Sequence, residues 1–280
     1  MDEEGFETLR TWQHLHMVDL LMSRKLTLLV DLDNTLLHTE DDGIIGAENC
    51  PDLIRWSGQE FSDWSFTKIR PYTLQFLHNM SELYELRICT MGNRAYAWKM
   101  AELLDNDGAL FGDRIHSRDD LLPIERPSKI GHLTNLFPCG DFMVVIIDDR
   151  EDVWNSPGNL IRVEPYEFFF PGSDNKMTVR TDDHDNYLLH LETLLRKVHH
   201  NFYTALMEND RDTPLPNIKE IVAGITNDDE SQCSVETPKK VETPSLKLIP
   251  TCSVTHTELF CFILSSILYM CCMHLLNIWM

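Results

Sequence analysis

Residues 28–39, LLVDLDNTLLHT, set the architecture of this chain. The apolar run stops at Asp31, and Asp33 and Thr35 follow at alternate positions. Strands buried on both faces of a parallel sheet read as short continuous apolar runs, and ligands collect beyond their carboxyl ends. We therefore expect Asp31 at a strand exit, with Asp33 and Thr35 in the loop. Neighbouring carboxylates repel, so a cation or shared proton is expected there; the alternative is an aspartate-rich turn without chemistry.

Further strand and helix patterns alternate along the chain. Strands are predicted at 25–30, 86–89, 143–147 and 160–163. Helices are predicted at 71–83, 94–104, 130–137 and 188–202. This alternation indicates a doubly wound parallel α/β sheet, and we assign it to one domain over residues 25–206.

The segments around this domain differ in composition. Residues 1–24 have apolar groups at helical spacing, which predicts an N-terminal helix that packs on the domain. Residues 40–66 are acidic and rich in turn residues, and they fit either a loop or a small hairpin near the site. Residues 207–258 are acidic, rich in Thr-Pro and poor in aromatic residues, which predicts a disordered linker.

Residues 259–280 form a hydrophobic segment without a formal charge. As a helix it would be about 33 Å long, enough to cross a bilayer core of about 30 Å. No Lys or Arg follows Lys247, however, and flanking cations are typical of membrane spans. Both a tail anchor in a membrane and an atypical tail that spans nothing fit this segment.

Charge and cysteine content narrow the classes of function and compartment. The formal net charge of −21 repels phosphate backbones, so we expect no direct binding of nucleic acid. None of the eight cysteines forms a C-x-x-C pair, which indicates reduced intracellular thiols rather than disulfides or a zinc site. The opening Met-Asp-Glu-Glu lacks the features of a signal peptide, so the catalytic part should face the cytosol or the nucleus.

Polar side chains follow three of the predicted strands: Asp31 and Asp33, then Thr90, then Asp148 and Asp149. In a parallel sheet these strand ends share one edge, so four carboxylates would meet there. A hard cation such as Mg²⁺ fits this set of oxygens. Lys129 is the candidate for a second positive charge, although a lone lysine more often faces solvent.

This arrangement resembles the haloacid dehalogenase superfamily of phosphotransferases, whose four motifs match DLDNT at 31–35, Thr90, Lys129 and the aspartate pair 148–149. Three longer runs narrow the match: SRD at 117–119, NLFPCGD at 135–141 and IIDDREDVW at 146–154. They resemble the FCP-type phosphatases, which act on the C-terminal repeat of RNA polymerase II. The resemblance covers roughly residues 25–203 and implies a Rossmannoid fold like that of the superfamily.

The resemblance also implies roles for the matched residues. Asp31 would be the nucleophile that accepts the phosphoryl group, and Asp33 the general acid and base. Thr90 and Lys129 would hold the phosphate oxygens. Thr35 would order the loop. The residues implied as the Mg²⁺ site are Asp31, Asp33 through its backbone carbonyl, Asp149, and Asp148 in support.

Arg70 and Arg118 match family positions that reach the phosphate or support the pocket, and surface salt bridges are the alternative for them. Asn34 departs from the family, which more often has Gln or Glu there. Residues 122–128 form a slightly long segment before Lys129. The acidic stretch after residue 206 stands where FCP-type enzymes usually carry a BRCT domain.

We expect a nuclear Mg²⁺-dependent protein serine/threonine phosphatase that acts on the phosphorylated polymerase repeat. One alternative is a phosphatase with another substrate, anchored through 259–280 in the nuclear envelope or the endoplasmic reticulum. The other is a pseudophosphatase that only binds phosphopeptides. Loss of Asp31 or Asp33 would have favoured this last alternative, and both are present.

Overall fold

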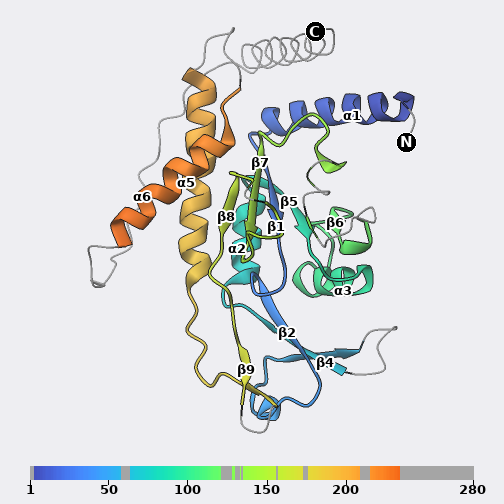
Figure 1. Cartoon of the computed structure of the whole chain (residues 1–280), viewed down its shortest axis with the longest axis vertical. Helices are drawn as coiled ribbons and strands as arrows, with labels where there is room; N and C mark the ends of the chain where they lie inside the picture. The colour runs from blue at the N-terminus through green and yellow to red at the C-terminus, as the bar shows by residue number, and fades with distance from the viewer. Residues whose placement is uncertain are drawn as a thin grey trace.

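A central sheet with helices packed against it forms the body of the computed structural model (Figure 1). The structure describes residues 3–57, 64–120, 128–129, 133, 135–155, 157–172, 176–208 and 215–233. In chain order its elements are α1 (Glu3–Met22), β1 (Leu26–Val30), β2 (Leu37–Asp41), the 3-10 turn η1 (Ala47–Asn49), β3 (Ile54–Ser57), β4 (Trp64–Ile69), α2 (Thr73–Ser81), β5 (Tyr84–Cys89), α3 (Arg94–Leu104), β6 (Ile115–His116), the 3-10 turn η2 (Arg118–Asp120), β7 (Val144–Asp148), β8 (Leu160–Arg162), β9 (Phe169–Pro171), β10 (Met177–Val179), α5 (Tyr187–Glu208) and α6 (Ile218–Cys233).

The central sheet has the strand order β6-β5-β1-β7-β8, and all of its strands run parallel. Every residue of β1 and β7 is buried, which explains why both strands read as unbroken apolar runs. The order reverses between β1 and β7, and ligands of such sheets bind beyond the carboxyl ends of the strands at the point of reversal. The predicted α/β class with a doubly wound parallel sheet is therefore confirmed.

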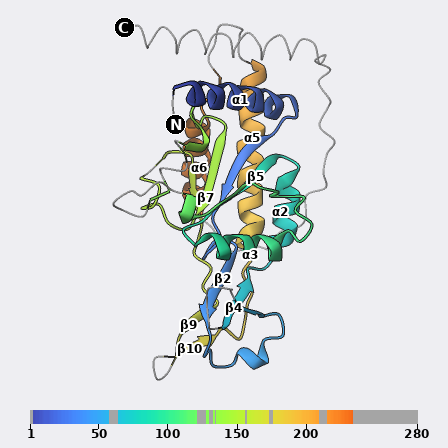
Figure 2. The same cartoon turned by 90° about the vertical axis from the view of Figure 1, so that its right-hand side faces the viewer.

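Helices bury their apolar faces against this sheet. Helix α3 covers the predicted residues 94–104. Helix α5 buries the five apolar positions that predicted it: Leu188, Leu191, Leu195, Val198 and Phe202. Half of the helix predicted at 130–137 lies outside the described residues, and Leu133, Asn135 and Leu136 are helical. Helix α1 lies across one end of the molecule, as predicted from its apolar spacing (Figures 1 and 2).

Residues 40–66, which were expected to form a loop or a small hairpin, contain β3 and parts of β2 and β4, and these strands form a small antiparallel sheet of order β2-β4-β3. Residues 58–63 lie outside the described residues. Both views place this sheet at the opposite end of the molecule from α1, beyond the carboxyl end of β1 (Figure 2). Hydroxyl groups join its strands: Thr39 and Thr67 lie 2.8 Å apart, and the Trp56 indole donates to Thr67 at 2.9 Å. These strands are only partly buried and their burial does not alternate regularly, so their sequence has neither an apolar run nor a clear period of two.

Helix α6 corrects the prediction of a disordered linker over 207–258 for residues 218–233. It packs against α5 and β8, and it buries Ile218, Val222 and Ile225. The composition of the whole stretch concealed these three positions, which share one helical face. Residues 234–258 and the hydrophobic segment 259–280 lie outside the described residues. Among the helices that are described, none has the length and apolar character needed to cross a bilayer.

Replacing Ile218 with Ala tests whether α6 belongs to the folded unit. Ile218 is fully buried, so we expect a loss of about 2–5 kcal/mol in the free energy of unfolding, measured in urea. The half-buried neighbour Ile221 is the control, and Ile221→Ala should cost about 1 kcal/mol or less. An unchanged urea midpoint for Ile218→Ala would mean that the domain ends before α6.

Candidate active site

The ends of three parallel strands bring the predicted residues together. Val30 pairs with both Ile88 and Ile147, so the next residue, Asp31, lies between β5 and β7 at the reversal of strand order. The Asp31 backbone N–H donates to the Ile147 carbonyl at 3.1 Å. Thr90 follows β5 and its N–H donates to the carbonyl of His116 at 2.9 Å. The register of the sheet thus produces the cluster.

Lys129 lies between two carboxylates of this cluster. Its ammonium donates to Asp31 Oδ1 and to Asp148 Oδ2, at 2.5 Å each, and its side chain is only 2% exposed. Burial alone would lower the pKa of Lys129, but the charges of Asp31 and Asp148 raise it above its ordinary value. Lys129 is therefore a buried permanent cation rather than the solvent-facing lysine of the alternative interpretation.

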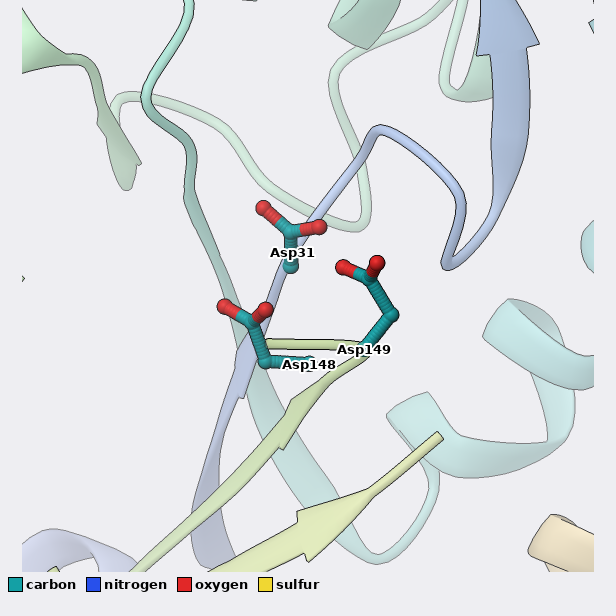
Figure 3. A group of neighbouring side chains, drawn as sticks. All are labelled: Asp31, Asp148 and Asp149. Carbon is teal, nitrogen blue, oxygen red and sulfur yellow. The ribbon is translucent and has the colours of Figure 1, made fainter. Parts of the chain in front are cut away.

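Asp31, Asp148 and Asp149 form a candidate metal centre. Figure 3 shows their carboxylates at neighbouring strand ends, and one oxygen of each lies within 4.8 Å of the others. One lysine cannot balance three carboxylates, and oxygen donors of this kind suit Mg²⁺. The donor set therefore fits the predicted cation. The carboxylate of Asp33 is not in this group, and a contact of its backbone carbonyl with the cation stays a prediction.

Repulsion and burial shift the protonation of this cluster. Burial raises the pKa of Asp31, the charges of Asp148 and Asp33 raise it further, and Lys129 opposes them. Burial and the charge of Asp148 raise the pKa of Asp149 to about 6. Because the pKa values of Asp31 and Asp149 are raised, protons compete with a divalent cation for these oxygens, so binding of the cation displaces protons.

This displacement predicts that Mg²⁺ binds more tightly as the pH rises. Because the raised pKa values favour protonated carboxyls, affinity should increase by up to about tenfold per pH unit and per proton displaced, between about pH 5 and pH 7. In the absence of Mg²⁺, the free energy of unfolding depends on pH in the opposite direction. The raised pKa values stabilise the fold below the ordinary pKa of a carboxyl group, and this contribution is lost as the pH rises. Calorimetric titration with MgCl₂ in two buffers of different ionisation enthalpy measures the protons released. A value of zero would contradict the prediction.

Asp33 faces a tyrosine that the sequence did not single out. The Tyr96 hydroxyl donates to Asp33 Oδ1 and contacts the Thr39 hydroxyl at 3.0 Å. Burial raises the pKa of Asp33, and the hydrogen bond from Tyr96 opposes this rise. Tyr96 lies six residues after Thr90, on the first turn of α3, so only its position behind that motif could have indicated it.

The loop after Asp31 is held in shape by its own side chains. The Thr35 hydroxyl donates to Asp31 Oδ2 at 3.2 Å, in agreement with the ordering role expected of Thr35. Asn34 adopts a left-handed φ of 59°, which asparagine tolerates better than most residues. Its side chain donates to the Tyr166 carbonyl at 3.1 Å, and its own carbonyl accepts from the Tyr166 N–H at 2.7 Å.

Arg70 supports this loop through several contacts. Its guanidinium binds both carboxylate oxygens of Asp185, at 2.9 and 2.8 Å, and donates to the Thr35 carbonyl at 3.1 Å. The rings of Tyr166 and Tyr187 lie 5.4 and 4.9 Å from it, and the residue is 1% exposed. Of the two roles expected of Arg70, these contacts favour support of the pocket over contact with phosphate.

Arg118 has a different environment. Its side chain is 56% exposed and lies 3.9 Å from Asp119, while its backbone N–H donates to the Gly92 carbonyl at 3.1 Å. This backbone bond connects η2 to the loop after Thr90, whose hydroxyl accepts from the Gly92 N–H at 3.0 Å. The exposed position of the Arg118 guanidinium near Asp119 agrees with the alternative of a surface salt bridge. Contact between Arg118 and a substrate stays a prediction.

Substituting each arginine with lysine separates these two environments. Arg70→Lys keeps the charge but loses the paired contact with Asp185 and the aromatic stacking, so we expect it to lower the free energy of unfolding by about 2 kcal/mol or more. Arg118→Lys should change it by about 0.5 kcal/mol or less, because its side chain is exposed. Equal urea midpoints for the two variants would contradict the supporting role of Arg70.

Comparison with known proteins gives the same family as these motifs. The model of the NLI interacting factor-like phosphatase family matches residues 26–206. A Caenorhabditis elegans protein named as a C-terminal domain phosphatase of RNA polymerase II is 39% identical over 216 residues, covering 73% of this chain and 32% of the relative. The human protein of the same name is 42% identical over 170 residues, covering 58% and 17%.

Solved structures agree with this relation. A structure of the fission yeast RNA polymerase II CTD phosphatase Fcp1 bound to beryllium fluoride matches with a TM-score of 0.64 and 28% identity, covering 75% of this chain and 72% of that one. The chain spans about a third or less of the two curated relatives' length. The resemblance to FCP-type phosphatases is confirmed, and the chain belongs to the NLI interacting factor-like phosphatase family.

Proposed function

We propose that this chain is a Mg²⁺-dependent protein serine/threonine phosphatase that acts on the phosphorylated C-terminal repeat of RNA polymerase II through an aspartyl-phosphate intermediate. The observation that carries the proposal is the position of Lys129 between Asp31 and Asp148, next to Asp149, at the reversal of strand order. A buried carboxylate beside a fixed cation and a candidate metal centre suits transfer of an anionic group.

In the first half of the proposed reaction, an oxygen of Asp31 attacks phosphorus and the bond to the serine or threonine oxygen breaks. Lys129 and Thr90 hold phosphoryl oxygens and balance their charge during the transfer. Asp31, Asp149 and the Asp33 carbonyl would hold the Mg²⁺ ion, whose positive charge would offset the repulsion between the carboxylate and the phosphate.

Asp33 moves the protons of both halves. It protonates the leaving oxygen and then takes a proton from the water that attacks the aspartyl phosphate, which restores Asp31 and releases phosphate. The raised pKa of Asp33 favours the protonated form that the first half needs. Tyr96 holds this carboxyl group at the edge of the site.

The names of the relatives support the polymerase repeat as the substrate and, with it, a nuclear location. The five residues with direct chemical roles in this scheme are all present: Asp31, Asp33, Thr90, Lys129 and Asp149. We therefore favour catalysis over phosphopeptide binding alone.

Phosphate release from a doubly repeated heptad peptide that carries phosphoserine tests this proposal. We expect phosphate release from this peptide that requires Mg²⁺ and stops with a chelator. A small aryl phosphate is used in parallel, and we expect the unphosphorylated peptide to have no effect on its hydrolysis. Release from the aryl phosphate alone would keep the chemistry but refute the polymerase substrate. Folded, Mg²⁺-loaded protein that hydrolyses neither compound would refute catalysis.

A further inference from the structure

Trp154 contacts Asp148 of the candidate metal centre, although none of the proposed reaction steps uses it. It belongs to the turn after β7, and its side chain is among the largest fully buried ones in the described part of the chain. The apolar residues packed around it are Leu29 of β1, Cys89 of β5, Val144 and Ile146 of β7, and Phe137 and Val153 outside the strands. Packing on the sheet therefore fixes where the indole N–H points.

The indole N–H of Trp154 points at Asp148. It donates to Asp148 Oδ2 at 2.7 Å, and the same oxygen accepts from the Lys129 ammonium at 2.5 Å. The other oxygen, Oδ1, accepts from the backbone N–H of Arg150 at 2.9 Å. Three donors on one carboxylate hold it in a single orientation, with the oxygen that accepts two of them turned toward Lys129.

The same turn also holds Lys129. The Lys129 N–H donates to the Val153 carbonyl at 2.8 Å, and the Ser128 hydroxyl donates to that carbonyl at 3.2 Å. The ammonium of Lys129 lies 5.5 Å from the centre of the Trp154 ring, where a cation is attracted to the aromatic face. The Val153 carbonyl thus holds the backbone of Lys129. The Trp154 side chain lies close to the Lys129 ammonium and binds Asp148, its carboxylate partner.

We propose that Trp154 is a positioning residue that keeps Asp148 as the partner of Lys129. Oxygens of Asp31, Asp148 and Asp149 lie within 4.8 Å of one another, so Asp148 could otherwise turn toward the cation. With Asp148 fixed by the indole, Asp31 and Asp149 are left to bind Mg²⁺, and Lys129 stays at Asp31. This inference rests on the proposed function, in which Lys129 holds the transferred phosphoryl group.

Trp154→Phe tests the role of the N–H, because phenylalanine keeps an aromatic ring and removes the donor. We expect kcat for an aryl phosphate to fall by about 10- to 100-fold, as for other residues that orient a ligand or its partner, with KM changed by about twofold or less. The matched control is Trp98→Phe, since Trp98 is exposed on α3, and it should retain full activity. A kcat for Trp154→Phe equal to that of the control would overturn the proposal.

A double-mutant cycle distinguishes positioning from general damage to the fold. In an Asp148→Asn background, Trp154→Phe should lower kcat by about twofold or less, because the contact through which Trp154 acts has already been changed. A full additional 10- to 100-fold loss in that background would show that Trp154 acts independently of Asp148, and would overturn the proposal.

A spectroscopic readout tests the contact between Trp154 and Asp148 without turnover. In a ¹H–¹⁵N spectrum, the indole signal that is missing from Trp154→Phe belongs to Trp154, and Asp148→Asn should shift it while leaving the Trp98 signal in place. A Trp154 signal that does not move in Asp148→Asn would overturn the inference. This variant retains Trp154, so the signal can be followed in it directly. If the wild-type chain releases no phosphate, the proposed function fails, and this spectrum still tests the contact between Trp154 and Asp148.

Discussion

Asp31→Asn is expected to lower the rate of phosphate release by roughly 10³-fold or more, as for other residues that form a covalent intermediate. Asparagine has nearly the shape of aspartate, but its neutral amide cannot attack phosphorus as a carboxylate does. The substitution also removes a carboxylate of the candidate metal centre, so Mg²⁺ affinity should fall as well. Steady-state release from an aryl phosphate measures the first effect, and calorimetric titration measures the second.

The same substitution should leave the metal-free fold intact. Burial raises the pKa of Asp31, so loss of its charge removes a desolvation cost, while Lys129 keeps a second carboxylate partner in Asp148. The urea midpoint of Asp31→Asn at neutral pH should therefore lie closer to the wild type than that of Lys129→Met, which leaves two buried carboxylates without their cation. Asp182→Asn is the control at an exposed aspartate, and it should keep full activity. Turnover by Asp31→Asn close to the wild-type rate would refute the aspartyl-phosphate mechanism.

Lys129→Met is expected to affect both stability and activity. Methionine has similar length but no charge, so two buried carboxylates, Asp31 and Asp148, lose their shared cation. Breaking a buried ion pair from one side costs about 3–5 kcal/mol, and we expect a loss of that size in the free energy of unfolding of the metal-free protein. Phosphate release should fall by roughly 10²-fold or more, because a charge at the phosphoryl oxygens is lost.

The pH dependence of the Lys129→Met defect identifies its cause. Without the ammonium, the pKa of Asp31 rises further, so the folded chain binds a proton that the unfolded chain releases. The deficit in stability should therefore shrink as the pH falls toward the ordinary range of a carboxyl group and grow above it. Lys99→Met is the control, since Lys99 pairs with Glu102 on the surface. A deficit that is independent of pH would indicate lost packing instead of unbalanced charge.

Local signals in the sequence were sufficient for four of the five strands of the central sheet and for α3 and α5, whereas the two-residue strand β6 was not predicted. The run that ends at Asp31 is apolar without alternation because β1 is buried on both faces, and this property does not depend on which strands lie beside it. Helix α3 begins at the predicted residue because Asn93 caps it locally, accepting from the Tyr96 N–H at 2.8 Å. The motif residues converge because parallel strands end at one edge.

Tertiary contacts decided the environment of these motif residues and the extent of the domain. Tyr96 reaches Asp33 across 63 positions of sequence, and Arg70 reaches Asp185 across 115. Helix α6 is stable where its apolar face meets α5, although the composition around it is typical of a linker. Periodicity reports which face of an element is buried, whereas the partner that a side chain meets there depends on strand order, register and packing between distant segments. Those quantities exist only once the chain has folded.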